Sequence, residues 1–458
     1  MRFRFLIIII LLTNEKRRDY KIKIAFKTLG CKVNQYETET LIDLCKEQNY
    51  EIVNFKEKAD IYIINTCTVT REAERKSKQM IRKAIKKNRM AKIIVTGCSA
   101  QSSFKDLKEI EGVHYIVGNE EKKDILDFAR RTDNQFPSIH VGSIKNVKKY
   151  STLSKNDPAL HTRSLVKIQD GCNNFCAYCE IPYVRGPQRS RKVDDILKEI
   201  DLLEEKGIKE VVLLGINLGS YGHDFSNKNI SLAKLIMRII IHCKRIERIR
   251  LSSIEVNHID DELINVIVQY PKICRHLHIP LQSGNDKILK MMNRPYDLTF
   301  FSKKINKIRK KMPGISITTD IMVGFPGEDN CSFEHAYQYI KTCEFSKLHV
   351  FPYSDRDHCL SRLLSNKIND ITKKERINRL LDLSNELLIK YRQKNIGKVK
   401  DILIETIKKD KVGAIVSYGM TDNYLRILIR DMIPRKGDLL KVRLKELHDD
   451  YILGKILQ

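Results

Sequence analysis

Short apolar segments alternate with longer helical segments in the N-terminal part of the chain, and this alternation constrains the fold more than any other feature. The expected strands are 22–26, 61–65 and 92–96, and the expected helices are 37–48 and 71–87. A strand, a helix and a second strand in succession form a βαβ unit, which requires a parallel sheet. The sequence therefore predicts an α/β domain with a parallel sheet over residues 21–131.

A second α/β region is predicted from residue 161 to residue 394. Its expected strands are 165–168, 210–214, 248–252, 276–279, 316–321 and 347–350, with helices between them. Six βα repeats of this kind indicate a complete or partial βα barrel. The polar segment 132–160, rich in Lys, Asn and Ser, is interpreted as a linker.

The C-terminal region, residues 395–458, has a different pattern. Short strands are expected at 402–406, 414–417, 424–429, 439–444 and 452–457. Five short strands separated by turn residues predict a small β-barrel of OB-like size. The charged helix 373–391 would connect it to the preceding region.

Residues 1–20 fit none of these three domains. Their apolar run, 5–12, is too short to span a bilayer and is followed by charged residues without a small-residue cleavage site. We interpret 1–20 as an N-terminal extension, and we expect no stable membrane association and a cytoplasmic location.

The chain is strongly basic, with 84 Lys and Arg against 57 Asp and Glu, a net charge of +27. Such an excess favours a polyanionic partner, and nucleic acid is the commonest one. A genome biased towards lysine codons would give the same excess, so charge alone leaves both explanations open.

Three of the 12 cysteines each follow a predicted strand of the N-terminal domain: Cys31, Cys67 and Cys98. The carboxyl ends of parallel strands share one edge of a sheet, where ligands bind. We therefore expect these three thiols to converge. In a reducing compartment, clustered thiols indicate metal ligands or redox groups.

The strongest signal is a second trio, Cys172, Cys176 and Cys179, spaced C-x3-C-x2-C on a loop after a predicted strand. Three thiolates can hold three irons of a [4Fe–4S] cluster and leave the fourth iron open to a cofactor. Structural zinc is the weaker alternative, because it needs four ligands and no fourth cysteine is near. This spacing, with Tyr178 before the last cysteine, resembles the radical S-adenosylmethionine (SAM) superfamily.

The resemblance extends over most of the chain, from about residue 21 to the end. It is similar to the tRNA methylthiotransferase family, and its first motif resembles the branch that acts on N6-threonylcarbamoyladenosine. The matching segments are TLGCKVNQYE at 28–37, INTCTVT at 64–70, TGC at 96–98, KIQDGC at 167–172, PYVRG at 182–186, LQSG at 281–284, DIMVGFPGE at 320–328 and FPYS at 351–354. The turn SYGMTDNY at 417–424 resembles the RNA-binding TRAM domain.

The resemblance implies an enzyme that adds a methylthio group to carbon 2 of N6-threonylcarbamoyladenosine at tRNA position 37. It implies two [4Fe–4S] clusters, the second held by Cys31, Cys67 and Cys98, together with SAM and an electron donor such as a flavodoxin or ferredoxin. Three alternatives stay open: a methylthiotransferase for isopentenyladenosine, one for a ribosomal protein, and a non-catalytic iron–sulfur protein that binds RNA.

Candidate contacts follow from position along the chain. Residues beside the cysteine loop or at strand ends are candidates for binding SAM: Tyr178, Leu214, Gly215, Ser253 and Glu255. Basic residues after the cysteine loop, with one tyrosine of the last domain, are candidates for RNA contact: Arg185, Arg189, Arg191 and Tyr424. His276 and His278 alternate on a predicted strand, a pattern more typical of hydrogen-bonded histidines than of a metal pair.

Overall fold

The computed structural model describes residues 21–132, 136–151, 162–226, 229–410, 413–430 and 433–457. The predicted extension 1–20 lies outside these residues. The chain packs as two compact units. The first contains the described residues up to Gly142 except Val69–Arg71, and the second contains Val69–Arg71 and the described residues from Ser143 onward.

The first unit is built on a six-stranded sheet in which every strand pair is parallel, as the alternating pattern predicts. Its strands, in spatial order, are β2 (Glu51–Val53), β1 (Lys23–Thr28), β3 (Ile61–Thr66), β4 (Lys92–Gly97), β5 (Tyr115–Val117) and β6 (Ser138–His140). Its helices are α2 (Lys32–Glu47), α3 (Arg71–Lys87), α4 (Cys98–Ser102), α5 (Phe104–Lys108) and α6 (Ile125–Arg130).

Strand β3 shows why this sheet has helices on both faces. All six of its residues are buried. Tyr62 and Ile64 belong to the hydrophobic cluster that includes α3, and Ile61 and Ile63 belong to the cluster that includes α2 and α6. Successive side chains of a strand point to opposite faces, so a continuous apolar run needs cover on both.

Strand β6 shows that part of the predicted linker belongs to the sheet of the first unit. It lies within 132–160, yet it pairs with β5 and completes the sheet. Residues 133–135 and 152–160 of that segment lie outside the described residues. Three-residue strands such as β5 and β6 carry too few residues for a periodic sequence signal.

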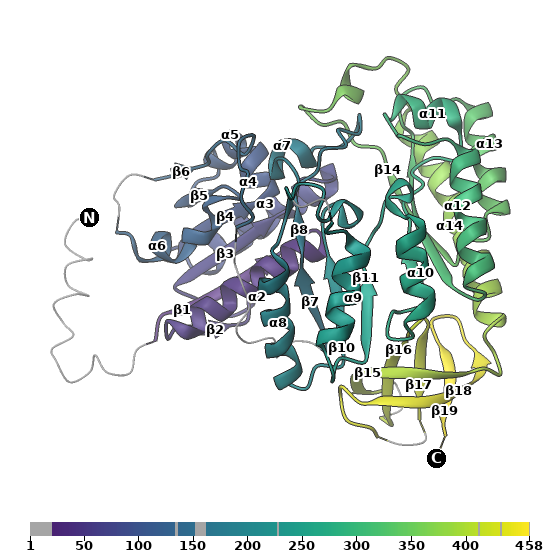
Figure 1. Cartoon of the computed structure of the whole chain (residues 1–458). Coiled ribbons are helices and arrows are strands. Elements are labelled where there is room, and N and C mark those ends of the chain that lie inside the picture. Colours follow the sequence, from purple (N-terminus) through teal and green to yellow (C-terminus); the bar gives the residue numbers. More distant parts are fainter. Residues whose placement is uncertain are drawn as a thin grey trace. The chain divides into compact units, whose positions relative to one another are not determined.

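The second unit contains the predicted partial βα barrel (Figure 1). Its six parallel strands form two three-stranded groups: β7 (Arg163–Lys167), β10 (Glu210–Leu214) and β11 (Arg248–Leu251), then β12 (His276–His278), β13 (Ser316–Val323) and β14 (Lys347–Pro352). Its longer helices are α8 (Val193–Glu205), α9 (Leu232–His242), α10 (Asp261–Gln269), α12 (Leu298–Lys311), α13 (Asn330–Thr342) and α14 (Asp370–Gln393).

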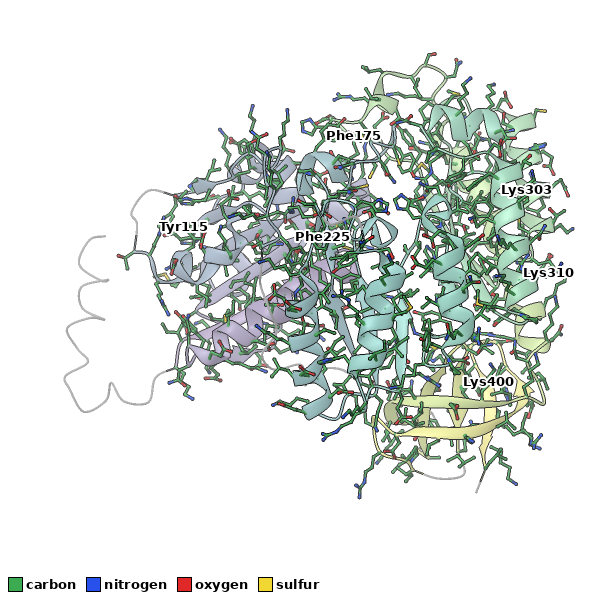
Figure 2. All side chains as sticks on the ribbon, viewed as in Figure 1. Tyr115, Phe175, Phe225, Lys303, Lys310 and Lys400 are labelled. Carbon is green, nitrogen blue, oxygen red and sulfur yellow. The ribbon has the colours of Figure 1, made fainter. Side chains whose placement is uncertain are left out.

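The strands and helices of this barrel share one large hydrophobic core. Each strand contributes alternate residues to it, as Val211 and Leu213 do in β10. The opposite faces of the helices are polar, and the exposed Lys303 and Lys310 of α12 project away from the strands (Figure 2). Within the described residues no helix is both long and apolar enough to cross a membrane.

The C-terminal strands close into the predicted five-stranded barrel. They are β15 (Val399–Lys409), β16 (Ile415–Thr421), β17 (Arg426–Ile429), β18 (Leu439–Leu447) and β19 (Ile452–Ile456). This barrel packs at the amino-terminal ends of β10 and β11. Arg250 donates hydrogen bonds to the carbonyl oxygens of Thr421 and Asp422, at 3.1 and 3.0 Å, and Arg248 donates to that of Met420 at 3.0 Å.

Glu210 neutralises the positive charge of the buried arginines at this junction. Its carboxylate lies 2.7 Å from Arg250 and 3.5 Å from Arg248. Burial alone would raise the pKa of Glu210, but Arg250 and its neighbours hold that pKa below its ordinary value. A buried charge is tolerated only when it is paired and hydrogen-bonded, and the carbonyls of the small barrel complete that pairing.

Candidate active site

The C-x3-C-x2-C loop comes shortly after the carboxyl end of β7, the first strand of the partial barrel. It follows β8 (Gln169–Asp170), and Gly171 begins it with φ +69°. A Cβ on Gly171 would collide with the carbonyl oxygen of Pro187, so the chain approaches its neighbour as closely as only glycine allows. The amide of Ala177 anchors the loop by donating to the Met292 carbonyl at 3.0 Å.

Each cysteine of this loop is partly buried, and two sulfurs accept hydrogen bonds. The Asn174 amide donates to Cys172 Sγ at 3.4 Å, and Arg294 Nη1 donates to Cys176 Sγ at 3.1 Å. Hydrogen bonds to the sulfurs are one means by which proteins tune iron–sulfur clusters. Burial raises the pKa of Cys172 to about 11 and that of Cys179 well above its ordinary value. Binding of a metal centre would therefore release protons from these thiols.

Arg294 is a site residue that the sequence did not identify. Its side chain is 1% exposed and forms an ion pair with Glu255, and its Nη2 donates to the Tyr296 hydroxyl at 2.9 Å. Burial alone would lower its pKa, but Tyr178, Glu255 and other neighbours hold the pKa of Arg294 well above its ordinary value. A permanent cation thus connects the cysteine loop to Glu255. Arg294 is 118 residues from Cys176 in the sequence, so no local motif could predict this contact.

The candidate SAM residues lie at neighbouring strand ends. Leu214 is the last residue of β10, and Gly215 follows it. Ser253 and Glu255 follow β11, which pairs with β10; Ser253 is exposed and Glu255 is partly buried. Tyr178 lies in the cysteine loop and packs against the cluster that contains Phe325. The structure thus places Leu214, Gly215, Ser253 and Glu255 after two paired strands of the partial barrel.

Gln169 connects two of these segments and was also missed. Its amide donates to the carbonyl oxygens of Asp170 and Gly171, at 2.9 and 2.8 Å, and its oxygen accepts from the Asn217 amide at 2.8 Å. One buried side chain therefore fixes the start of the cysteine loop relative to the segment after β10.

The second cysteine trio is distributed over three adjacent strands, β1, β3 and β4, as predicted. Cys31 lies three residues past β1, and Cys67 and Cys98 follow β3 and β4 directly. A Cβ on Gly30 would lie 2.7 Å from Cys67 Sγ, so residue 30 and Cys67 are in close contact. Three thiols at the carboxyl edge of adjacent strands are a donor set that suits an iron–sulfur cluster.

A buried lysine is connected to this trio through Asn119. Lys122 pairs with Glu37 at 2.6 Å and donates to the Asn119 side-chain oxygen at 3.2 Å. The Asn119 amide is 4.0 Å from Cys98 Sγ. Lys122 thus positions Asn119, whose amide can donate to a cysteine sulfur of the trio.

Three predicted RNA contacts need correction. Arg185, Arg189 and Arg191 are 1%, 4% and 2% exposed. Arg185 pairs with Asp170 at 3.1 Å, and Arg191 pairs with Glu199. Guanidinium groups that are buried and neutralised in this way cannot reach a phosphate, and instead they hold the segment after the cysteine loop.

Tyr424 has a mixed environment. Its ring stacks on His276 with centroids 4.5 Å apart, and Arg250 lies 5.1 Å from its centroid, so one face contacts the partial barrel. The residue is still 37% exposed. A clearer aromatic and basic surface surrounds Tyr418 of β16: the charged groups of Arg426 and Lys408 lie 4.4 and 4.9 Å from its ring centroid, and Tyr451 packs edge-on at 6.2 Å.

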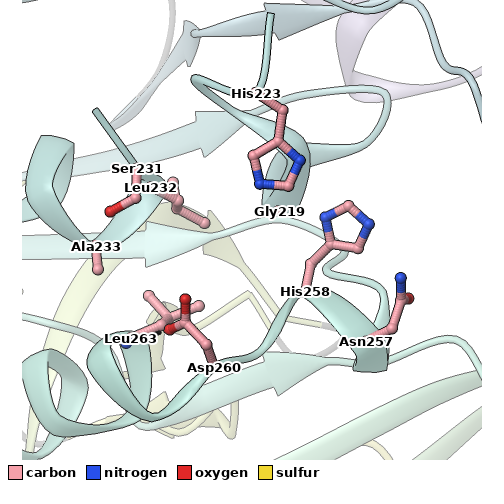
Figure 3. A pocket seen from close by; sticks show the side chains of 9 residues that line it. All are labelled: Gly219, His223, Ser231, Leu232, Ala233, Asn257, His258, Asp260 and Leu263. Carbon is pink, nitrogen blue, oxygen red and sulfur yellow. Dashed lines mark hydrogen bonds between the residues drawn. The ribbon is translucent and has the colours of Figure 1, made fainter. Parts of the chain in front are cut away.

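A pocket of about 310 Å³ opens among the segments that follow β10 and β11 (Figure 3). His223 and His258 stack in it with centroids 5.4 Å apart, and Figure 3 shows the two rings facing one another across Gly219. The lining residues are Gly219, His223, Ser231, Leu232, Ala233, Asn257, His258, Asp260 and Leu263. None of the cysteines lines it. Burial lowers the pKa of His258, which favours a neutral ring.

Two family models match the chain. Residues 23–118 match the uncharacterized protein family UPF0004, and residues 166–340 match the radical SAM superfamily. Together with the partial barrel and the cysteine loop, the second match defines a radical SAM enzyme, a class that uses SAM and a [4Fe–4S] cluster.

Curated relatives narrow this class. The chain is 39% identical over 436 residues to threonylcarbamoyladenosine tRNA methylthiotransferase MtaB of Bacillus subtilis, which covers 95% of the chain and 96% of the relative. It is 36% identical to the protein of the same name from Aquifex aeolicus, over 92% of the chain and 100% of the relative. The tRNA-2-methylthio-N(6)-dimethylallyladenosine synthase of Thermodesulfovibrio yellowstonii is 34% identical over 95% of the chain. The chain belongs to the tRNA methylthiotransferase family, as its motifs predict.

A solved structure shares the fold at low sequence identity. The radical SAM methyltransferase TsrM of Kitasatospora setae, with cobalamin and a [4Fe–4S] cluster bound, matches with a TM-score of 0.56 and 13% identity, covering 75% of the chain and 77% of TsrM. At this sequence identity the similarity shows a shared fold and does not indicate the substrate.

Proposed function

We propose that this protein adds a methylthio group to carbon 2 of N6-threonylcarbamoyladenosine at position 37 of tRNA. The observation that carries the proposal is the 39% identity, over 95% of the chain, to a relative with that name. Three relatives so named are 33–39% identical, whereas the dimethylallyladenosine synthases named among the relatives are 32–34% identical. The difference favours the threonylcarbamoyladenosine branch.

The reaction requires a hydrogen to leave an aromatic carbon that is not acidic, so a general base does not suffice. A [4Fe–4S] cluster with SAM supplies a carbon radical that attacks such a bond. Cys172, Cys176 and Cys179 would hold this cluster. With three protein ligands the cluster would stay open to SAM, and the partly buried loop would limit access of water.

Arg294 and Glu255 would position the bound SAM. Their ion pair lies between the cysteine loop and the segment after β11. The cation can attract a carboxylate and the anion can attract an ammonium group, which are the two charges of an amino acid end. Tyr178 would place an aromatic ring beside them, while Leu214, Gly215 and Ser253 offer main-chain and hydroxyl groups at the same edge.

Cys31, Cys67 and Cys98 would hold a second [4Fe–4S] cluster that serves sulfur transfer. Their location at one sheet edge and the Lys122–Asn119 contacts support this role. We further expect a flavodoxin or ferredoxin to supply electrons and the protein to work in the cytoplasm, where its tRNA substrate is found.

Analysis of tRNA nucleosides tests the proposed function most directly. In a strain that lacks the gene, mass spectrometry should show loss of the methylthio form of N6-threonylcarbamoyladenosine and accumulation of the unmodified form. The chain supplied on a plasmid should restore it. Loss of methylthio-isopentenyladenosine instead would assign the chain to the other branch, and unchanged tRNA would contradict the proposal.

The surface around Tyr418 is the proposed RNA contact of the C-terminal barrel. Exposed cations beside half-exposed rings can bind phosphates and stack on bases. Arg426 and Lys408 are exposed, whereas Tyr418 and Tyr451 are partly buried. This surface replaces Arg185, Arg189 and Arg191 as the candidate nucleic-acid site. Tyr424 remains a further candidate.

Replacing Tyr418 and Arg426 together with Ala should weaken tRNA binding by about tenfold or more, since stacking on one aromatic residue is worth about 1–3 kcal/mol. The slope of affinity against salt should also decrease by about one phosphate contact. Fluorescence anisotropy with labelled tRNA measures both quantities. Lys303→Ala, on the exposed face of α12, is the matched control. Equal affinity of the double variant and the wild type would remove this surface from the tRNA site.

Replacing Arg294 with Gln should reduce SAM cleavage by about 10- to 100-fold, the usual loss when a residue that orients a metal ligand is changed. The reason is that Cys176 loses its charged donor and Glu255 loses its partner. The yield of 5′-deoxyadenosine and the absorbance of the cluster measure the two effects. Arg379→Gln, an exposed arginine paired with Glu334, should behave as wild type; wild-type cleavage in Arg294→Gln would refute the assigned role.

A further inference from the structure

Three side chains with metal-binding atoms lie together on the second half of the partial barrel. They come from three neighbouring strands: His278 from β12, Asp320 from β13 and His349 from β14. The strand register explains the grouping. His278 is opposite Thr318, two residues from Asp320, and Asp320 is directly opposite His349. All three therefore project from the same face of the sheet.

The distances among these side chains suit a single ion. His278 Nε2 is 3.1 Å from one oxygen of Asp320, and His349 Nδ1 is 3.9 Å from the other. One ligand atom from each residue lies within 4.8 Å of the other two. Zinc bonds to nitrogen and oxygen are about 2.0–2.2 Å, so ligand atoms around one ion are about 3–3.5 Å apart. Small side-chain rotations would bring this set to that spacing.

A supporting hydrogen bond fixes the His278 ring. The Thr318 hydroxyl lies 2.9 Å from His278 Nδ1 and 3.0 Å from His276 Nε2. The hydroxyl has one proton. When it donates that proton to His276, it accepts from His278 Nδ1, and the Nε2 lone pair of His278 then faces Asp320. Metal-binding histidines are usually held in this way, with the second nitrogen donating to a fixed oxygen.

The site is accessible from solvent. The side chains of His278, Asp320 and His349 are 12%, 27% and 53% exposed, so the buried ring is fixed while the outer ligand leaves an entry path. Two imidazoles and one carboxylate suit borderline divalent transition ions, whereas Mg²⁺ and Ca²⁺ prefer oxygen ligands alone. Three protein ligands also leave coordination positions for water or an oxygen of another molecule.

We propose that His278, Asp320 and His349 form a binding site for one divalent transition-metal ion of the zinc type, separate from both cysteine trios. The alternative is a hydrogen-bonded histidine–aspartate pair without a metal. The chain contains such a pair elsewhere, because His242 Nε2 lies 2.6 Å from Asp201. That pair belongs to none of the possible metal-ligand groups found among the described residues, which makes it the matched control.

Zinc binding to the full-length protein with reconstituted clusters tests the proposal. Under anaerobic conditions, competition with a chromophoric chelator should show about one Zn²⁺ bound per chain. His349→Ala and Asp320→Asn should each lose this equivalent. Thr318→Val should keep it with about 10- to 100-fold weaker affinity, because only the supporting hydrogen bond is removed. His242→Ala should match the wild type.

Iron content and the thermal unfolding midpoint, measured on the same samples, establish that each variant is folded and carries its clusters. His349 is half-exposed, so its replacement should change neither. Absence of a bound Zn²⁺ in the wild type, or the same equivalent in wild type, His349→Ala and Asp320→Asn, would overturn the metal site. Neither result would affect the proposed tRNA reaction, because binding alone is measured.

Discussion

Replacing Cys176 with Ala should abolish both 5′-deoxyadenosine formation and the methylthio modification of tRNA. The remaining two thiolates hold a [4Fe–4S] cluster poorly, and Arg294 loses the sulfur to which it donates at 3.1 Å. Iron should fall from about eight to about four per chain, one cluster's share. Iron analysis, chromatography of the nucleoside product and mass spectrometry of tRNA measure the three quantities.

Cys331→Ala is the matched control for this substitution, because Cys331 is an exposed cysteine of α13. It should retain iron, cleavage and modification at wild-type levels. Formation of 5′-deoxyadenosine by Cys176→Ala would show that this loop does not hold the cluster that cleaves SAM. In that case the proposed radical chemistry would fail.

Replacing Cys67 with Ala should separate the two clusters. Methylthiolated tRNA should be lost, while some 5′-deoxyadenosine formation remains, because Cys67 belongs to the first unit and the cysteine loop belongs to the second. Iron should again fall by about four per chain. The same three measurements apply, so the two variants differ only in whether SAM cleavage survives.

Cys45→Ala is the control for Cys67→Ala. Cys45 is a buried cysteine of α2, in the hydrophobic core of the same unit, and burial raises its pKa to about 12. It should remain a neutral core residue, so its replacement should leave both clusters intact. Full methylthiolation by Cys67→Ala would disprove the proposed role of the first unit in sulfur transfer. Full iron content would disprove the second cluster.

Most of the regular structure was predictable because it depends on local patterns. Short segments rich in apolar residues, each between two helical segments, predicted β1, β3, β4 and all six strands of the partial barrel. Alternating short strands predicted the closed C-terminal barrel. Strands β2, β5 and β6 were missed; each has three residues, which give only a weak period. The equally short β12 was predicted as part of the longer segment 276–279.

The sequence also determined both cysteine trios. The spacing of Cys172, Cys176 and Cys179 is local, and a loop of eight residues brings the three together whatever surrounds it. Cys31, Cys67 and Cys98 are distant in sequence, but each follows a strand of a parallel sheet, and the topology rule places such positions at one edge. The grouping of these cysteines depends on the order of strands and helices along the chain, so the sequence alone can predict it.

Only the tertiary structure decided which charged side chains face each other. Arg185, Arg189 and Arg191 look like a basic surface in sequence, yet Asp170 and Glu199 neutralise them inside the protein. Arg294 reaches Cys176 across 118 residues, and His278, Asp320 and His349 meet across three strands. Burial and pairing between distant side chains depend on packing, which has no period along the chain. The sequence by itself therefore determined the fold class and the positions of the two cysteine trios in it, and packing decided the residues that surround them.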